Sequence, residues 1–315
     1  MRIAASIRFL HIVLLVLAIT RPAGAQIIES VGSRAQGMGG AFVAVADDSS
    51  ATWWNPAGLA AGPFFDMALA KNVTEQPEAP AAWREQASWF ALGTPPFGVS
   101  YYRLRITDIQ ASSPTVAGGA GRQDGGAGVF VRPLDVSQLG ATLVRSIASG
   151  VHVGTTLKWE RGEPFENGNT SNQFDLDFGA LAIGGPVRIG FVARNLREAD
   201  FEGLALPRQV RLGFAYDASG AGGPPLTVAF DADLQSYPVS GVDRRVLAVG
   251  AEQWLFAKRV GIRGGARFNR EGAEDRTATF GLSVSPRAGL YLDGNVVHGG
   301  AGDDEGWGVA ARVSF

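Results

Sequence analysis

The sequence predicts an all-β protein, a transmembrane antiparallel β-barrel of about fourteen strands. Three observations predict it: apolar and polar residues alternate along most of the chain, the alternating segments have the length of membrane-spanning strands, and the last residue is the aromatic Phe315. Hydrophobic residues make up 46% of the 315 residues, but the mean hydropathy is only +0.06. This balance fits strands with one apolar face, since a membrane-spanning helix needs about 20 mostly apolar residues in a row.

The first 25 residues have the pattern of a secretory signal peptide. Arg2 and Arg8 accompany an apolar run from Phe9 to Ile19, which is too short to span a bilayer, and small residues precede Gln26. A basic start, a short apolar run and a small-residue site are typical of exported proteins, so we expect cleavage after Ala25. A buried N-terminal helix is the alternative.

The alternation is clearest over residues 226–235. Apolar side chains occupy the even positions there, whereas Thr227, Asp231 and Asp233 occupy odd positions. Successive side chains of a strand point to opposite faces, so one face is expected to meet lipid and the other the lumen. The expected strands are 64–72, 86–93, 96–105, 138–147, 151–160, 173–182, 187–195, 208–217, 225–235, 244–254, 260–269, 276–285, 288–297 and 305–315.

The connections between these strands alternate in length. Short turns are expected at 93–96, 148–150, 183–186 and 286–287, and longer polar loops at 106–137, 161–172, 196–207, 236–243, 270–275 and 298–304. Outer-membrane barrels have short turns at the periplasmic rim and longer loops outside. The sequence therefore predicts a bacterial outer-membrane location with a periplasmic N-terminus.

The last expected strand, 305–315, carries a second signal. Trp307 and Val309 alternate with polar positions, and Phe315 ends the chain. A C-terminal aromatic residue on such a strand resembles the signal read by the barrel assembly machinery, so Phe315 is predicted to be that signal. An ordinary terminal strand of a soluble β-protein is the alternative.

Charged residues occupy many of the positions predicted to face the lumen. Opposite charges on neighbouring strands can pair on one face. We expect Asp175 and Asp177 to meet the arginines of the next strand, and a network that fills and stiffens the lumen; a selective ionic path is the alternative. The predicted network consists of Asp175, Asp177, Arg188, Arg194, Arg211, Asp231, Asp233, Arg263, Arg267 and Arg312.

The composition gives little support to catalysis. The chain has no cysteine, its formal net charge is −2, and His152 and His298 lie far apart. We therefore expect no enzyme activity, no cofactor, no metal and no nucleic-acid partner. The sequence Asp47-Asp48-Ser49-Ser50 could supply cation ligands, but such clusters more often cap a helix or a turn.

Residues 32–61 contain several motifs in a fixed order. Arg34-Ala35 and the Gly37–Gly40 cluster come first, and Ala41-Phe42-Val43, Ala46-Asp47-Asp48 and Asn55-Pro56-Ala57-Gly58-Leu59 follow. This order resembles the N-terminal signature of the FadL-type outer-membrane transport family and its PorV/PorQ-type relatives. Fourteen is also the number of strands in FadL-type barrels.

The resemblance implies that residues 26–62 form a hatch inside the barrel formed by residues 63–315. A FadL-type hatch closes the periplasmic end, and its shift opens a path for hydrophobic molecules. The predicted hatch and gating residues are Gly37, Gly39, Gly40, Phe42, Asp47, Asp48, Asn55 and Pro56, with Asn55 as helix N-cap and Pro56 at the first helical position. Possible ligand contacts are Trp53, Trp54, Trp89 and Tyr102, near Phe90 and Tyr101.

Two functions follow from the resemblance, and a third from the polar lumen. The first is passive uptake of hydrophobic small molecules. The second is a PorV/PorQ-like accessory role, in which the barrel anchors proteins of a secretion system. The third is a simple pore with a polar lumen. The expected partners are outer-membrane lipid, the barrel assembly machinery, and either a hydrophobic ligand or secretion-system proteins.

Overall fold

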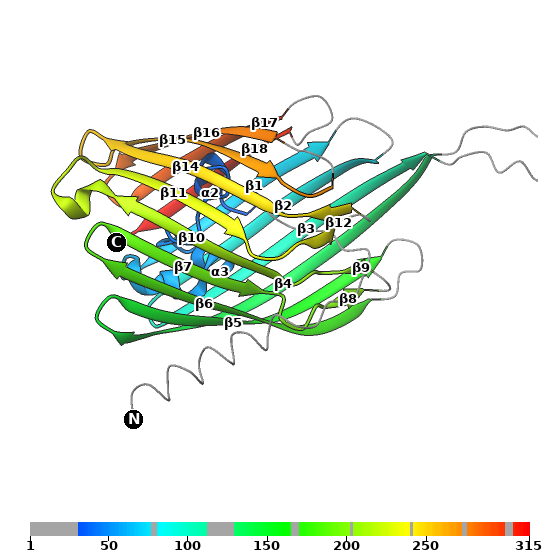
Figure 1. Cartoon of the computed structure of the whole chain (residues 1–315). Helices are drawn as coiled ribbons and strands as arrows, with labels where there is room; N and C mark the ends of the chain where they lie inside the picture. The colour runs from blue at the N-terminus through cyan, green and yellow to red at the C-terminus, as the bar shows by residue number, and fades with distance from the viewer. Residues whose placement is uncertain are drawn as a thin grey trace, which may run out of the picture.

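Fourteen antiparallel strands close into a barrel (Figure 1). The computed structural model describes residues 31–76, 81–111, 129–164, 170–201, 204–239, 242–272, 276–299 and 305–315, so the expected signal peptide lies outside the described residues. Each strand pairs with its neighbours in the order of the chain, and pairing of the last strand with the first closes the barrel. Closure leaves no unpaired sheet edge, which confirms the predicted fold class.

The barrel strands in order are β1 (Asp66–Gln76), β2 (Ala81–Thr94), β3 (Phe97–Ala111), β4 (Val129–Ala148), β5 (Val151–Pro164), β6 (Ser171–Gly184), β7 (Val187–Arg194), β10 (Gln209–Asp217), β11 (Leu226–Asp233), β14 (Val246–Leu255), β15 (Val260–Asn269), β16 (Arg276–Arg287), β17 (Leu290–Gly299) and β18 (Glu305–Ser314). Two hairpins, β8 (Asp200–Phe201) with β9 (Leu204–Ala205) and β12 (Tyr237–Val239) with β13 (Val242–Arg244), lie in the connections.

Four short helices complete the described chain. Three precede the barrel: α2 (Ser33–Gly37), α3 (Ala51–Trp54) and the 3-10 helix η1 (Pro56–Ala61). The fourth, η2 (Ala218–Ala221), lies in the turn between β10 and β11. Within the described ranges, none of the helices has the length and apolarity to cross a bilayer.

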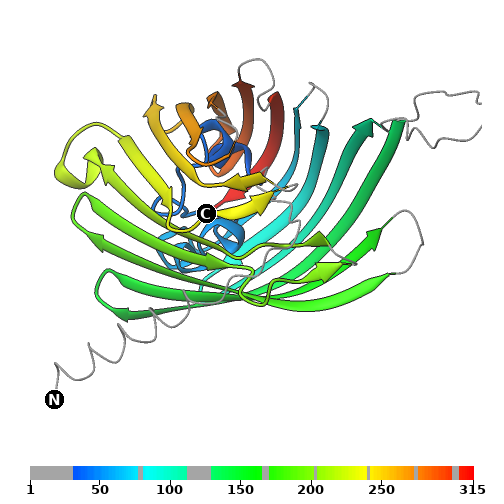
Figure 2. The same cartoon turned by 45° about the vertical axis from the view of Figure 1, so that its right-hand side comes forward.

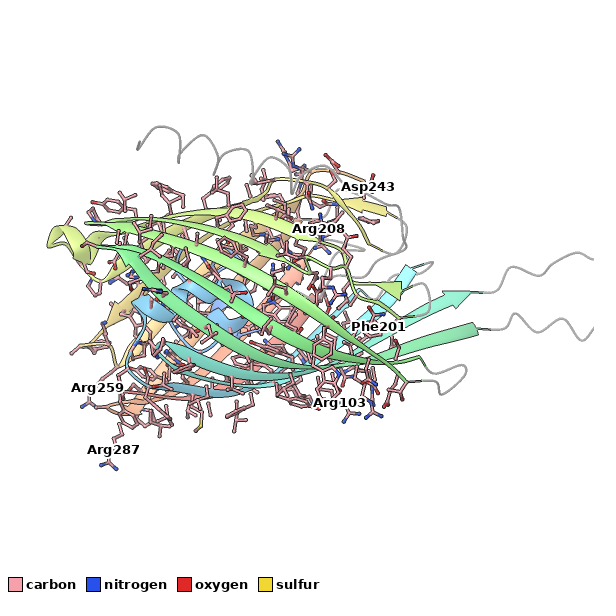
Figure 3. All side chains as sticks on the ribbon, turned by 90° about the horizontal axis from the view of Figure 1, so that it is seen from below. Arg103, Phe201, Arg208, Asp243, Arg259 and Arg287 are labelled. Carbon is pink, nitrogen blue, oxygen red and sulfur yellow. The ribbon has the colours of Figure 1, made fainter. Side chains whose placement is uncertain are left out.

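The two ends of the barrel differ as the sequence predicts. The turns after β2, β4, β6 and β16 contain two residues each and lie at one end, here called the short-turn rim. Phe315 lies there too, where its N–H donates to the Phe65 carbonyl at 2.8 Å. Figure 3 shows Arg259 and Arg287 at this rim and Arg208 and Asp243 at the other end, here called the long-loop rim.

The two faces of the wall separate apolar from charged side chains. Phe230 points outward and is 46% exposed, whereas the next residue, Asp231, points into the lumen and is 1% exposed. Trp159 and Phe174 stack on the outer face with ring centroids 6.1 Å apart. An apolar outer band around a polar interior is the surface of a membrane-spanning barrel.

The predicted strand ends were wrong at the long-loop rim. The expected loop 106–137 is mostly strand, because β3 continues to Ala111 and β4 begins at Val129, and the remaining connection lies outside the described residues. Similarly, β2 begins at Ala81 rather than at residue 86. Beyond the apolar band both faces of a strand meet polar surroundings, so alternation fades while the backbone ladder continues. The outward pair Arg105 and Asp135 occupies such a position.

Candidate functional site

Residues 31–62, here called the luminal segment, lie inside the barrel (Figure 2). Phe42 and Trp54 are fully buried although the segment contains only short helices. The helix α2 packs against β16 and β17, whereas η1 packs against β4, β5 and β6 on another part of the wall. The segment therefore crosses the lumen, on the side of the short-turn rim.

Glycines of the wall provide the space for this segment. A Cβ atom at Gly154 would lie 2.6 Å from the Ala57 nitrogen, and one at Gly265 would lie 2.5 Å from the Gly39 nitrogen. Both distances are too short for a Cβ atom, so only glycine fits at these two positions. The wall glycines that face the luminal segment are Gly93, Gly98, Gly154, Gly179, Gly190, Gly213, Gly250, Gly265 and Gly281.

Two glycines of the luminal segment itself are required by the backbone. Gly39 and Gly40 have φ angles of +68° and +80°, in the left-handed region that favours glycine. A Cβ atom at Gly39 would also lie 2.8 Å from the Ala266 nitrogen of β15. Gly37, the third predicted gating glycine, approaches Gly281 of β16.

Asn55 connects two parts of the luminal segment to the wall. Its Oδ1 accepts a hydrogen bond from the Ala57 N–H at 3.2 Å, so Asn55 caps η1, which begins at Pro56 as expected. Its Nδ2 donates to the Val43 carbonyl at 2.8 Å and to the Ala180 carbonyl of β6 at 3.1 Å. One amide therefore positions the start of a helix, a loop and a strand.

Arg34 is the centre of a buried ion cluster. Its Nη1 lies 2.5 Å from Asp47 Oδ1 and 3.0 Å from Asp48 Oδ2, and its Nη2 lies 2.8 Å from Glu252 Oε1 of β14. The guanidinium also lies 5.2 Å from the centre of the Phe42 ring. Asp47 and Asp48 thus bind an arginine of the same segment, and the cluster ties this segment to the wall.

Burial and the surrounding charges act against each other in this cluster. Burial alone would lower the pKa of Arg34, but Asp47, Glu252 and Asp48 raise that pKa well above its ordinary value. Burial would raise the pKa of Asp48, but Arg34, Arg312 and a hydrogen bond from Ser50 hold it below its ordinary value. Arg34 and Asp48 are therefore both kept in their charged forms.

Asp231 holds the middle of the luminal segment. Its Oδ2 accepts hydrogen bonds from the Phe42 N–H at 2.7 Å and from the Val43 N–H at 2.9 Å. The neighbouring lumen position carries Asp233, whose Oδ1 lies 2.6 Å from Nε of Arg211 on β10. Arg211 and Asp233 both belong to the predicted network, and they lie opposite each other on neighbouring strands.

Asp175 and Asp177 were expected to meet Arg188 and Arg194 of the next strand, and of these two arginines Arg188 does not pair with them. Both carboxylates pair with Lys158 of β5, whose Nζ lies 2.9 Å from Asp177 Oδ1 and 3.6 Å from Asp175 Oδ2. Arg188 pairs instead with Asp47 and Asp217, at 3.4 and 3.3 Å. In the β5–β6 register Lys158 lies directly opposite Asp175, a relationship that depends on register and not on residue type.

Three other predicted charges also lie against the luminal segment or its partners. Arg263 Nε lies 2.5 Å from Glu252 Oε2, and Arg312 Nη1 lies 3.3 Å from Asp66 Oδ2. Arg194 covers the rings of Trp53 and Trp54 at 5.8 and 5.3 Å. Arg267 is buried in the lumen wall of β15.

Aromatic side chains gather beside α3. The rings of Trp53 and Tyr102 lie 4.9 Å apart, those of Trp89 and Tyr102 lie 5.9 Å apart, and all three residues are buried. Trp54 instead packs on Phe42 and donates to the Val31 carbonyl at 2.8 Å. A cavity of about 10 Å³ next to Trp53 has room for one water molecule at most, so this conformation is closed here.

Arg34, Glu252 and Lys158 are site residues that the sequence pattern did not predict. Lys158 belongs to the alternating segment Thr156-Leu157-Lys158-Trp159-Glu160, so its lumen-facing position could have been found. Glu252 lies in the expected strand 244–254, where alternation is weak. Nothing in the local pattern connects it with Arg34, which lies 218 residues earlier.

Together these features define a transmembrane β-barrel whose lumen is occupied by its own N-terminal segment. The same fold occurs in solved structures of FadL-type transporters. The toluene transporter TbuX of Ralstonia pickettii is 14% identical with a TM-score of 0.64, and the match covers 91% of this chain and 99% of that chain. A FadL homologue of Pseudomonas aeruginosa is 11% identical with a TM-score of 0.66, covering 93% and 100%.

A third similar structure is the monoaromatic hydrocarbon channel CymD, with 11% identity, a TM-score of 0.64 and coverage of 92% and 99%. No model of a known protein family matches the chain, and no curated protein matches it. The likeness is therefore one of fold, and the similar proteins are transporters or channels rather than enzymes.

Proposed function

We propose that this protein lets small hydrophobic compounds cross a bacterial outer membrane passively, and that displacement of the luminal segment opens the path. The observation that carries this proposal is the noncovalent attachment of a buried segment across the lumen, through Arg34, Asp231 and the wall glycines. A segment attached in this way can move without breaking the barrel ladder.

The substrate class is supported by the site and by the similar structures. Trp53, Trp89 and Tyr102 form an aromatic surface between the luminal segment and β2 and β3. TbuX is a toluene transporter and CymD a monoaromatic hydrocarbon channel. The secretion-accessory alternative is not favoured, because the similar structures reported above are transporters and channels.

The proposed orientation places the short-turn rim in the periplasm. In this orientation the expected signal peptide at residues 1–25 is removed during export, and the luminal segment closes the periplasmic side of the lumen. Phe315, which is 71% exposed at the same rim, remains the proposed signal for the barrel assembly machinery.

A reversible tether tests the gating role. The chain has no cysteine, so an introduced pair is unique. A Cβ atom at Gly98 of β3 would lie 3.0 Å from Thr52 Cγ2 of α3, so cysteine side chains at these two positions would be in direct contact, as a disulfide requires. The Thr52→Cys/Gly98→Cys variant would therefore bind α3 to the wall under oxidising conditions.

We expect the oxidised double variant to lose uptake of radiolabelled toluene in cells and to regain it after reduction. The two single-cysteine variants should transport equally with and without reductant. Mass spectrometry would establish how much of the pair is oxidised. Undiminished uptake by a fully oxidised protein would contradict gating by this segment.

A further inference from the structure

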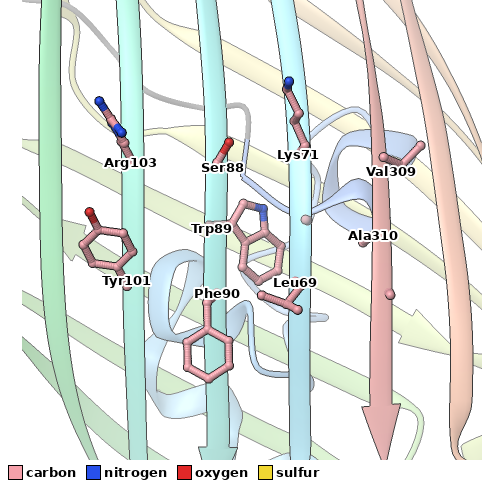
Figure 4. Close-up of a pocket in the computed structure, with 11 residues that line it drawn as sticks. Leu69, Lys71, Ser88, Trp89, Phe90, Tyr101, Arg103, Val309 and Ala310 are labelled. Atoms are coloured by element: carbon pink, nitrogen blue, oxygen red, sulfur yellow. The ribbon is translucent and has the colours of Figure 1, made fainter.

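A groove of about 660 Å³ lies on the outer face of the barrel, over β1, β2, β3 and β18. Figure 4 shows Lys71, Ser88 and Arg103 on one level of this groove, toward the long-loop rim. The level below, toward the short-turn rim, is apolar and aromatic and consists of Leu69, Phe90 and Tyr101, whereas Val309 lies opposite Lys71 on the upper level.

The two levels are successive outward rows of the same sheet. Lys71 lies opposite Ser88 and Ser88 opposite Arg103, so the two cations stand on strands that flank β2. With strands about 4.8 Å apart, their backbones are separated by about 10 Å. The hydroxyl of Ser88, a short and exposed side chain, lies between them.

The cationic level has more positive than negative charge. Within the described residues Lys71 has no ion-pair partner. Asp135 lies 3.7 Å from Arg103, but it already forms two bonds of 3.0 Å with Arg105. Asp135 thus compensates one of the three cations Lys71, Arg103 and Arg105, which leaves two positive charges uncompensated at this part of the outer face.

The groove lies at the edge of the apolar band. The apolar level continues around the wall through Leu139 and Trp159, whereas the polar level continues through Ser137 and Arg161. In a membrane-spanning barrel, the boundary between acyl chains and headgroups lies where the outer face changes from apolar to polar side chains. An occupant of this groove would meet cations at headgroup depth and apolar side chains at acyl-chain depth.

We propose that this groove binds a membrane lipid with a phosphate in its headgroup. The phosphate lies between Lys71 and Arg103, and an acyl chain runs along Leu69, Phe90 and Tyr101. The excess of positive charge attracts an anionic headgroup, and the apolar level provides contacts for a hydrocarbon chain of the same molecule. This proposal concerns the outer face and does not depend on transport through the lumen.

Native mass spectrometry of the full-length protein, delipidated in nonionic detergent, tests the site. The probes are dimyristoylphosphatidic acid, dimyristoylglycerol with the same chains but no phosphate, and inorganic phosphate. We expect one phosphatidic acid to bind, and binding about tenfold or more weaker in the Lys71→Gln/Arg103→Gln variant. We expect dimyristoylglycerol and inorganic phosphate to bind far more weakly.

The matched control is Arg259→Gln/Arg287→Gln, which removes two cations from the opposite rim (Figure 3). This control should bind phosphatidic acid like the wild type. A Phe90→Ala variant should weaken phosphatidic acid binding while both cations remain. The proposal is overturned if the Lys71→Gln/Arg103→Gln variant keeps wild-type affinity, if dimyristoylglycerol binds as well as phosphatidic acid, or if inorganic phosphate binds as tightly as the lipid.

Discussion

Arg34 and Glu252 form a doubly bonded ion pair between the luminal segment and β14, with Nε and Nη2 each 2.8 Å from a carboxylate oxygen. Glu252 is 2% exposed and also receives Nε of Arg263 at 2.5 Å. One carboxylate thus compensates two buried guanidinium groups that come from distant parts of the chain. This relationship makes Glu252 the first residue to test.

Replacing Glu252 by glutamine should loosen the luminal segment. The amide keeps the shape but removes the negative charge, and loss of one partner of a buried ion pair costs about 3–5 kcal/mol. We expect a lower free energy of unfolding, measured by tryptophan fluorescence in urea, and a larger leak conductance in planar bilayers. The control Glu75→Gln breaks the half-exposed pair with Arg84 and should change stability by less than about 1 kcal/mol. Equal effects of the two substitutions would contradict a central role for Glu252.

Substitutions of Asp231 should separate hydrogen bonding from charge. Asp231→Ala leaves the buried N–H groups of Phe42 and Val43 without their acceptor, and each unsatisfied group costs about 1–3 kcal/mol. Asp231→Asn retains a carbonyl oxygen in the same place and should cost less. Thermal unfolding of the detergent-solubilised protein measures both. The expectation fails if the asparagine variant is as unstable as the alanine variant.

Two neighbouring glycines of β15 provide a matched test of the close packing. Gly265→Ala should push the luminal segment from its position, because the new methyl group would lie 2.5 Å from the Gly39 nitrogen. Gly264→Ala should change stability by no more than about 0.5 kcal/mol, since its nearest neighbour is 3.9 Å away. We expect a larger leak conductance for Gly265→Ala alone. Similar conductance in both variants would show that the packing does not hold the segment.

Lowering the pH should weaken the attachment of the luminal segment to the wall, because Asp48 loses its negative charge. Because the folded protein holds the pKa of Asp48 below its ordinary value of 3.8, the stabilisation is complete above that value and disappears as the pH falls through the folded pKa. The difference in melting temperature between the wild type and Asp48→Asn should therefore stay constant from neutral pH to about pH 5 and then narrow.

Comparing the wild type with Asp48→Asn removes the contribution of other carboxylates, because these titrate in both proteins. A difference in melting temperature that is unchanged well below the ordinary pKa of Asp48 would show that the charge of Asp48 does not contribute to stability. A difference that narrows already near neutral pH would point to another titrating group.

Much of the barrel followed from the alternation of side chains. The fourteen strands, their two faces and the rim with short turns could all be predicted, because a strand between lipid and lumen must alternate. The strand ends at the long-loop rim could not, since β3 and β4 continue beyond the apolar band, where hydrophobicity no longer marks a face. The aromatic pair Trp89 and Tyr102 was predicted near the hatch, and the same alternation accounts for Phe90 and Tyr101 on the outer face.

By itself, the sequence determined which residues face the lumen, because that choice depends only on the period of two along each strand. Which of these residues form ion pairs with one another was decided by the tertiary structure alone. Lys158 rather than Arg188 pairs with Asp175 and Asp177, and Arg34 reaches Glu252. These ion pairs depend on strand register, on closure of the whole barrel and on the path of the luminal segment. These are properties of all fourteen strands together, and no local pattern contains them.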